Sequence, residues 1–294
     1  MNSSRETKRP AWWLRTASSP RVSRLVGRVY RTPLPRLLVR PVIRAYTSLL
    51  GVDLSEVALP LSEFRSLDSF FTRTLVPGAR PIDPDPRAAV WPADGTLLEA
   101  GELGSGQDRR SFSIKGTVYA LEALLGDPAG AQALEGGGFA VIHLSPRDYH
   151  RIHWPMDLTV LRVRHIPGRR YPVNRLGLES GAPVYIENER VVMETRCPGG
   201  EPFYIVLVAA FGVGGISLSF DTPPAEAADD PFPSEKRYPE GRKVRKGEDL
   251  GAFHLGSSVV MGWSRGAMML KQPLPERSIV GRCMGQIQQG NVRG

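Results

Sequence analysis

The feature that most limits the possible folds is a series of short apolar segments with few helical segments between them. Stretches rich in β-branched and aromatic residues occur at 139–144, 158–165, 183–186, 191–195, 204–211, 216–220 and 253–263, and each predicts a β-strand. Beyond the N-terminal 52 residues, helical character is expected in a mixed region at 57–71 and a short segment at 118–125. Because strands and helices do not alternate regularly, the sequence predicts an α+β fold with a β-rich, sandwich or barrel-like core.

Other patterns exclude several classes of protein. Residues 221–247, dense in proline and charge, predict a surface excursion between strands. The longest strongly apolar run, 203–211, is far shorter than the roughly 18 residues needed to cross a bilayer. Two cysteines, Cys197 and Cys283, argue against a disulfide framework and fit a reducing compartment. The glycine clusters at 136–138 and 212–215 lack the context of a nucleotide site, and no metal-ligand cluster is expected.

The positive charge of the chain is concentrated at its N-terminus. Residues 1–50 contain eleven Lys or Arg and one acid, whereas the rest of the chain carries a net charge of −2. Val22, Leu25 and Val29 follow helical spacing, and Trp12 and Trp13 would suit a headgroup layer. Near an anionic leaflet each basic side chain contributes on the order of 1 kcal/mol. The pattern predicts a membrane-associating helical appendage at 1–52 and a second domain at 53–294. A helix packed on the protein's own core, or a mitochondrial transit segment, are the alternatives.

Residues 145–155 hold the densest group of reactive side chains. His150, His153, Tyr149, Asp148 and two arginines lie between two prolines, in a chain with only five histidines. Imidazole titrates near neutral pH, so the pair suggests proton transfer. In an extended strand His150 and His153 would point to opposite faces unless a turn or bulge redirects one of them. Two structural histidines at a strand end remain the alternative.

A Gly-Ser-Ser step interrupts the apolar segment 253–263. Glycine inside a strand pattern marks a bulge or a close backbone approach, which is the ordinary interpretation of this tripeptide. The Ser257 hydroxyl could also attack the uncovered carbonyl of Gly256 to give an ester. Elimination across the serine Cα–Cβ bond and hydrolysis would then leave a pyruvoyl group. The chain would thereby cut itself and make its own cofactor.

Several motifs occur in an order that resembles the phosphatidylserine decarboxylase family. They are residues 92–95 (PADG), 114–116 (IKG), 121–126 (LEALLG), 145–153, 166–168 (IPG), 188–191 (NERV), 246–248 (KGE) and 253–258 (FHLGSS). A looser similarity covers 67–73 and 80–82, so that the resemblance extends over roughly residues 60–270.

The resemblance implies a role for individual residues. Asp94, His153 and Ser257 match the triad of self-cleavage, in which Asp94 orients the imidazole, His153 takes the hydroxyl proton and Ser257 attacks. His150 matches a second active-site histidine with a role in decarboxylation. Cleavage between Gly256 and Ser257 would give a large chain, 1–256, and a small chain, 257–294. Ser258 stands where bacterial members commonly have threonine, which keeps a hydroxyl, and the small chain is short.

The activity implied by the resemblance is that of a carboxy-lyase. A pyruvoyl group derived from Ser257, without metal or pyridoxal phosphate, would form a Schiff base with phosphatidylserine and release phosphatidylethanolamine. His150 or His153 would protonate the carbanion. Alternatives are a pyruvoyl-dependent decarboxylase of a soluble amino acid and a non-catalytic membrane-binding relative.

Further expectations concern contacts and location. Lys115, Arg147, Tyr149 and Arg151 are candidate substrate contacts, whereas His143, His165 and His254 are expected to be ordinary strand positions. The predicted partners are an anionic phospholipid membrane, phosphatidylserine and the two chains of the same proenzyme, with a possible homodimer and no nucleic acid. The predicted location is peripheral, at the cytoplasmic face of a bacterial inner membrane, with the mitochondrial inner membrane as the alternative.

Overall fold

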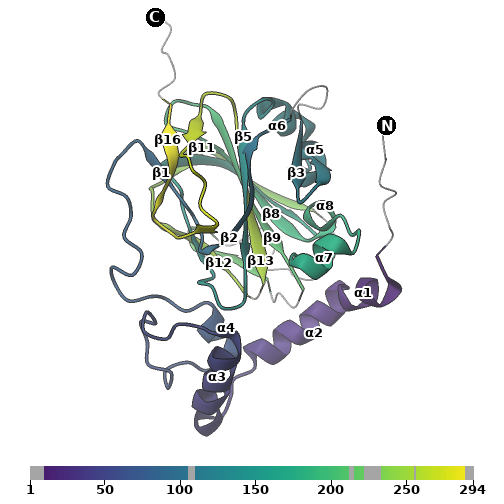
Figure 1. Cartoon of the computed structure of the whole chain (residues 1–294), viewed down its shortest axis with the longest axis vertical. Coiled ribbons are helices and arrows are strands. Elements are labelled where there is room, and N and C mark those ends of the chain that lie inside the picture. Colours follow the sequence, from purple (N-terminus) through teal and green to yellow (C-terminus); the bar gives the residue numbers. More distant parts are fainter. Residues whose placement is uncertain (1–9, 105–109, 212–214, 222–232, 255, 289–294) are drawn as a thin grey trace, which may run out of the picture.

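A large antiparallel sheet forms the centre of the molecule in the computed structural model, which describes residues 10–104, 110–211, 215–221, 233–254 and 256–288 (Figure 1). The sheet has the strand order β11-β7-β8-β9-β13-β5-β2-β15. These strands are β11 (Ser234–Val244), β7 (Leu158–Ile166), β8 (Arg190–Arg196), β9 (Pro202–Ala209), β13 (Ser257–Trp263), β5 (Gly138–Leu144), β2 (Gly95–Glu102) and β15 (Arg277–Ser278). The predicted α+β fold with a β-rich core is confirmed.

Two small sheets pack against one face of the large sheet. One has the order β10-β12-β6, from β10 (Ile216–Leu218), β12 (Asp249–Phe253) and β6 (Arg151–His153). The other has the order β1-β16-β14, from β1 (Ala88–Val90), β16 (Cys283–Ile287) and β14 (Met268–Leu270). Val259 and Met261 of β13 point into the core between these sheets, together with Ile152 and Phe253. This core is the interior of a β-sandwich.

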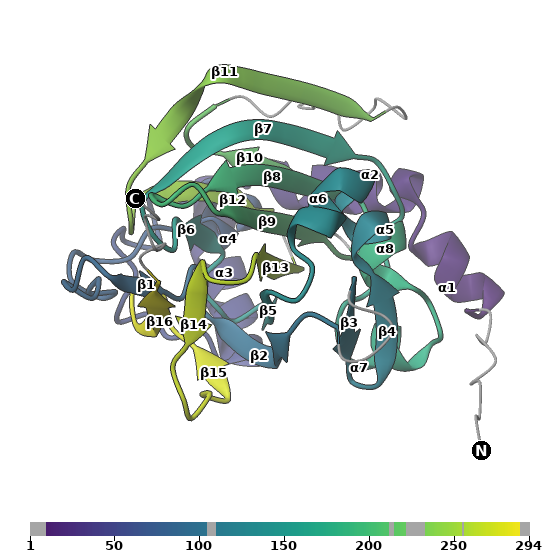
Figure 2. The same ribbon diagram turned by 90° about the horizontal axis from the view of Figure 1, so that it is seen from above.

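The opposite face of the large sheet is covered by helices and a hairpin. The hairpin is β3 (Ser111–Ile114) and β4 (Thr117–Ala120), and the helices are α5 (Leu121–Leu125), α6 (Pro128–Ala133) and α8 (Val184–Glu187), with α7 (Arg175–Glu179) nearby (Figure 2). Val260 of β13 contributes to this second core, on the other side from Val259. Since both faces are covered, every residue of β13 is buried.

The N-terminal helices lie along the lower edge of the sheets in Figure 1. They are α1 (Trp12–Ala17), α2 (Pro20–Arg31) and α3 (Arg36–Leu50), followed by the short α4 (Leu67–Phe71). The Ser19 side chain caps α2, and Pro20 occupies its first turn. Val39 and Ile43 of α3 pack with Phe64 and Phe70 in a separate small core. The predicted helical appendage is therefore present, and the domain boundary at residue 52 stays a prediction.

Three local predictions were wrong. Residues 183–186 form the start of helix α8 instead of a strand, because Pro183 caps the turn and a run of four apolar residues carries no decisive period. Residues 118–120 belong to strand β4, where Tyr119 stacks on Phe112, and only 121–125 are helical. The supposed surface excursion contains the long edge strand β11, whose exposed, charged residues hide the alternation of a strand. Residues 222–232 of the predicted excursion and residues 212–214 of the second glycine cluster lie outside the described residues.

Candidate active site

Ser257 is the first residue of β13 and is held between two neighbouring strands. Its backbone pairs with Leu144 of β5 and Ala209 of β9, and its side chain has no exposed surface. Among the described residues, no hydrogen-bond partner reaches the Ser257 hydroxyl. A buried hydroxyl without a partner is costly, and such groups in folded proteins often serve chemistry. The predicted nucleophile is therefore buried and uncommitted.

The carbonyl of Gly256, which Ser257 would attack, is hydrogen-bonded. The Ala210 N–H donates to it at 3.1 Å. This donor is held by the 188–191 motif, because the Asn188 side chain donates to the Ala209 carbonyl and the Ala209 N–H donates to the Glu189 carbonyl. A backbone N–H at a carbonyl under attack stabilises the developing oxyanion. Sequence reasoning missed Ala210, because a backbone donor leaves no signal in residue types.

His150 is fully buried beside the ring of Phe71, with 3.9 Å between the ring centroids. Its Nδ1 lies 3.0 Å from the Asp148 carbonyl, so Nδ1–H donates there and Nε2 carries the lone pair. Nε2 has no hydrogen-bond partner among the described residues. Burial, aided by the charge of Arg73, lowers the pKa of His150 to about 3, so the ring is neutral.

His143 is closer to the cleavage strand than its interpretation as an ordinary strand residue suggests. It lies on β5 opposite Ser258, and its ring interacts with the backbone of Ser257. Burial lowers the pKa of His143 as well. The position is a strand position, as predicted, and it also borders the candidate site.

His153 holds a defined orientation on β6. Its Nδ1 donates to the Gly247 carbonyl at 2.9 Å, and its Nε2 accepts from the Tyr149 hydroxyl at 3.2 Å. Burial raises the pKa of Tyr149 to about 12, which keeps the proton on the phenol. The turn before β6 thus places the two histidines in different environments. His150 is buried without a partner at Nε2, whereas His153 is bonded at both nitrogens.

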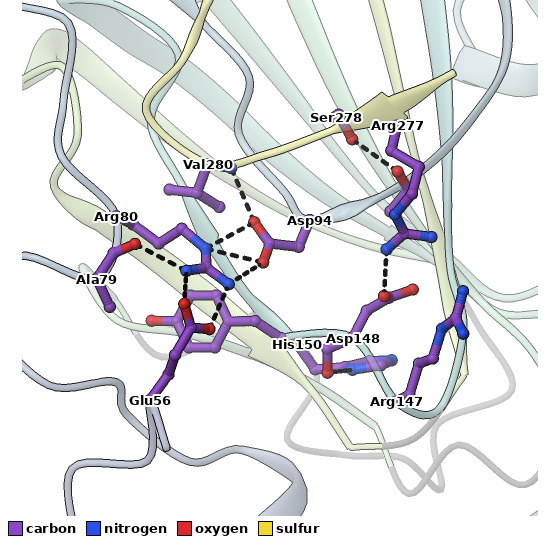
Figure 3. Close-up of polar contacts among 12 residues, drawn as sticks. Glu56, Ala79, Arg80, Asp94, Arg147, Asp148, His150, Arg277, Ser278 and Val280 are labelled. Atoms are coloured by element: carbon purple, nitrogen blue, oxygen red, sulfur yellow. Dashed lines mark hydrogen bonds and ion pairs between the residues drawn. The ribbon is translucent and has the colours of Figure 1, made fainter. Parts of the chain in front are cut away.

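Asp94 is engaged by an arginine rather than by His153. Arg80 donates to it through Nε at 2.9 and 3.1 Å and through Nη2 at 2.6 Å, and the Val280 N–H donates at 2.8 Å (Figure 3). The same Arg80 binds Glu56 through both terminal nitrogens at 2.9 Å. No hydrogen bond joins any two of Asp94, His153 and Ser257. Tyr149 links two of the three indirectly, since its hydroxyl bonds His153 and the charge of Asp94 raises its pKa.

A cleft of about 450 Å³ opens beside these residues. It is lined by parts of 51–56, 73–81, 147–149 and 277–282 and by Asp94. Of the predicted substrate contacts, Arg147 and Tyr149 line this cleft. Arg151 forms an ion pair with Asp249 instead, and Lys115 lies in the β3–β4 turn over the opposite face of the large sheet. The structure therefore brings two of the four candidates to the cleft.

The remaining histidines have carboxylate neighbours. His254 Nδ1 contacts Asp68 of α4 at 2.8 and 3.0 Å, and its Nε2 lies 3.2 Å from the Ser217 hydroxyl. His165 lies 3.3 Å from Glu189, which is paired with Arg170. Among the described residues, His, Cys, Asp and Glu side chains form no group of three suited to a metal ion.

Comparison with known proteins decides the family. The family model for phosphatidylserine decarboxylase matches residues 67–278. The chain belongs to the phosphatidylserine decarboxylase family. It is similar to proteins named phosphatidylserine decarboxylase proenzyme: 36% identical to that of Brevibacillus brevis over 82% of this chain and 83% of the relative, and 37% identical to that of Shewanella loihica over 84% and 86%. The relative from Anaeromyxobacter is 36% identical over 87% of this chain and 90% of the relative. The family resemblance predicted from the motifs is confirmed.

Proposed function

We propose that this member of the phosphatidylserine decarboxylase family cleaves itself between Gly256 and Ser257 and then decarboxylates phosphatidylserine. The observation that carries the proposal is the uncommitted Ser257 hydroxyl beside a Gly256 carbonyl that accepts from Ala210. The same arrangement fits a pyruvoyl group, because the site is dry, Gly256 leaves the carbonyl uncovered, and a donor is already in place.

In the first stage the chain's own residues cut the backbone. Ser257 Oγ attacks the Gly256 carbonyl, its proton passes to His153, and the peptide becomes an ester with a free amine on residue 257. The Ala210 N–H stabilises the oxyanion. Loss of the Cα proton then expels the Gly256 carboxylate, and water hydrolyses the resulting enamine, releasing ammonia. For this step His153 Nε2 must exchange the Tyr149 hydroxyl for Ser257. Asp94 must in part leave Arg80 and replace the Gly247 carbonyl at His153 Nδ1 to orient the ring.

In the second stage the pyruvoyl group would supply a carbonyl that binds the substrate amine and accepts the electrons freed as carbon dioxide leaves. The protein residues exclude water from the site and transfer one proton. His150, buried against Phe71 with a free Nε2, is the group proposed to take up the proton that the substrate ammonium releases and to deliver it to the substrate carbon. A positioned proton donor contributes about 10² to 10⁴ in rate.

The first stage is tested by denaturing mass analysis of the purified protein. Wild type is expected to yield two chains, 1–256 and 257–294, the second blocked by a keto acid, whereas Ser257→Ala stays whole. Ser258→Ala is the matched control: its hydroxyl points to the other core, 3.5 Å from the Tyr185 hydroxyl, and its loss should leave cleavage intact. Active wild type that remains a single chain would overturn this stage.

The second stage is tested with carbonyl chemistry. Borohydride added with phosphatidylserine should attach substrate to the small chain, and hydroxylamine should abolish release of carbon dioxide. Activity that survives hydroxylamine would remove the pyruvoyl group from the mechanism.

The helical appendage supports peripheral attachment to an anionic membrane. Small residues of α2, Ser23 and Gly27, face inward, while Leu25 and Val29 are 63% and 64% exposed. Further apolar side chains of α1 and α3 are exposed at Trp12, Trp13, Leu37, Leu38 and Leu49, among the exposed arginines Arg15, Arg21, Arg28, Arg40 and Arg44. Exposed apolar and basic side chains on the same helices are typical of segments that lie in a headgroup layer. No helix in the described part of the chain is long and apolar enough to cross a membrane.

Vesicle flotation tests the attachment. Wild type should float with vesicles that contain phosphatidylglycerol, less so in high salt, and much less with pure phosphatidylcholine. Leu25→Ser with Val29→Ser should reduce flotation, whereas Val118→Ser, at an equally exposed valine of the β3–β4 hairpin, should not. Equal loss in both variants would contradict a role for α2. The location at the cytoplasmic face of a bacterial inner membrane, with the mitochondrial inner membrane as the alternative, stays a prediction, as does the homodimer.

A further inference from the structure

Arg73, two residues after α4, is a buried cation with incomplete bonding. Its side chain is 5% exposed and lies over the Phe70 ring. One terminal nitrogen, Nη2, donates to the carbonyls of Arg147 and Asp148, both at 3.2 Å. Its other two nitrogens, Nε and Nη1, are buried and find no acceptor among the described residues. Two backbone carbonyls therefore hold one edge of the guanidinium and leave the rest unsatisfied.

The carboxylates near Arg73 are already committed to other partners. Asp148 accepts from Arg277 at 2.5 Å and from Ser145, and Asp94 accepts from Arg80 and Val280. Guanidinium stays protonated in proteins, so burial leaves a full positive charge on Arg73. A buried charge without a counterion costs several kcal/mol. An anion that reached the free N–H groups would remove this cost.

The cleft brings an anion next to this charge, and a shift of the Arg73 side chain would let it reach the buried Nε and Nη1. Arg73 lines the 450 Å³ cleft together with Arg147 and Arg282, whose exposed side chains have no hydrogen bond or ion pair with the described residues. Arg80 pairs with Asp94 and Glu56, and Arg277 pairs with Asp148 (Figure 3), whereas Asp53 accepts hydrogen bonds from Ser55. The cleft lining holds five arginines against these four acids, which leaves a net charge of +1.

We propose that Arg73 is the anion receptor of the cleft and binds the phosphodiester of the substrate headgroup, with Arg147 and Arg282 at the entrance. This assignment rests on the proposed function for the nature of the substrate. Its Nε and Nη1 offer donors to phosphate oxygens, in charge-assisted hydrogen bonds. Because Arg282 belongs to residues 257–294, the small chain would supply part of the substrate site.

The reaction favours the phosphodiester over the carboxylate as the bound group. The substrate carboxylate loses its charge as carbon dioxide forms, so a salt bridge to it would stabilise the reactant more than the transition state. The phosphodiester keeps its charge throughout, and binding it equally in both states lowers KM without lowering kcat. An anion at Arg73 would also reduce the positive field that disfavours a proton on His150.

The kinetic experiment uses processed enzyme with short-chain phosphatidylserine in detergent. Arg73→Met is expected to raise KM about 10- to 100-fold, as for the loss of charge-assisted hydrogen bonds, with kcat within about two-fold of wild type. Arg73→Lys keeps the positive charge but lacks the planar guanidinium, so its KM should lie between those of wild type and Arg73→Met. Arg87→Met, at an exposed arginine away from the cleft lining, is the control and should match wild type. A loss confined to kcat, or no change in KM, would overturn the proposal.

A binding experiment separates this inference from the proposed function. The full chain with Ser257→Ala cannot react, so calorimetry can measure binding alone. Glycerophosphoethanolamine, which keeps the phosphodiester and lacks the carboxylate, should bind and lose about 10- to 100-fold on Arg73→Met, whereas free serine should be insensitive to that change. If serine binding depends on Arg73, then Arg73 binds the substrate carboxylate instead of the phosphodiester. If inorganic phosphate binds as tightly as glycerophosphoethanolamine, the site recognises free phosphate and not the headgroup. Either result overturns the proposal. If Arg73→Met fails to fold, Arg73→Lys decides.

Discussion

The two ends of the site differ in how completely their polar groups are paired. Around Arg80, both carboxylates and the guanidinium satisfy one another, and the network joins residues 56 and 80 to the core at Asp94 and Val280. Among the groups proposed for chemistry and substrate binding, the Ser257 hydroxyl, His150 Nε2 and two nitrogens of Arg73 are buried without partners among the described residues, although Arg73 lines the same cleft as Arg80. Buried polar groups that are paired stabilise the folded structure. Buried polar groups without partners destabilise it, and they gain hydrogen bonds when a substrate or a reacting group supplies the partner. The comparison predicts that the Arg80 end governs stability and the Ser257 end governs rate.

The largest expected effect is on the rate at the unpaired end. His150→Asn should keep self-cleavage but lower the rate of carbon dioxide release by about 10² to 10⁴, since the positioned proton donor is lost. The measurement is release of labelled carbon dioxide from phosphatidylserine by the processed variant. His254→Asn is the control, because His254 is bonded at both nitrogens. This variant should lower the rate of carbon dioxide release less than tenfold. Equal losses in the two variants would break the distinction between paired and unpaired histidines.

The same distinction explains how much the sequence could reveal. The order of the motifs predicted the family, and the apolar strands β9 and β13, expected within 204–211 and 253–263, were recognisable because both of their faces are buried. Residue type and motif order predicted the roles of Ser257, His150 and His153, which stay proposals, but could not predict their hydrogen-bond partners. That Asp94 binds Arg80, or that Ala210 donates to Gly256, depends on contacts between segments far apart in the chain. Arg73 was missed because the sequence does not show whether an arginine has a counterion nearby in the folded chain.

The next effect is on stability at the paired end. Arg80→Met should lower the free energy of unfolding by about 3 kcal/mol, because it leaves Asp94 and Glu56 without their counterion in a partly buried site. Urea unfolding of the unprocessed Ser257→Ala chain measures it. Arg87→Met, whose arginine side chain is 68% exposed, should change stability by less than about 0.5 kcal/mol.

A double variant sharpens this test. Adding Asp94→Asn to Arg80→Met removes the stranded charge and should recover part of the loss, so that the two changes are not additive. Additive losses would mean that Arg80 stabilises the fold by packing alone.

The smallest expected effect is the pH dependence of stability that His150 produces. Its pKa is about 3 in the folded chain and about 6.5 when unfolded, so below pH 6.5 the unfolded state binds a proton that the folded state does not. His150 therefore destabilises the fold as pH falls through 6.5, by roughly 2 kcal/mol at pH 5, and has no effect above pH 7. Urea unfolding of Ser257→Ala at pH 7 and pH 5, compared with Ser257→Ala carrying His150→Asn, isolates this contribution, because His143 shifts in the same direction in both proteins. The chain with His150 should lose about 2 kcal/mol more than the variant. Parallel losses would mean that the His150 ring accepts a proton in the folded state, and that the Ser257 end is less dry than its burial indicates.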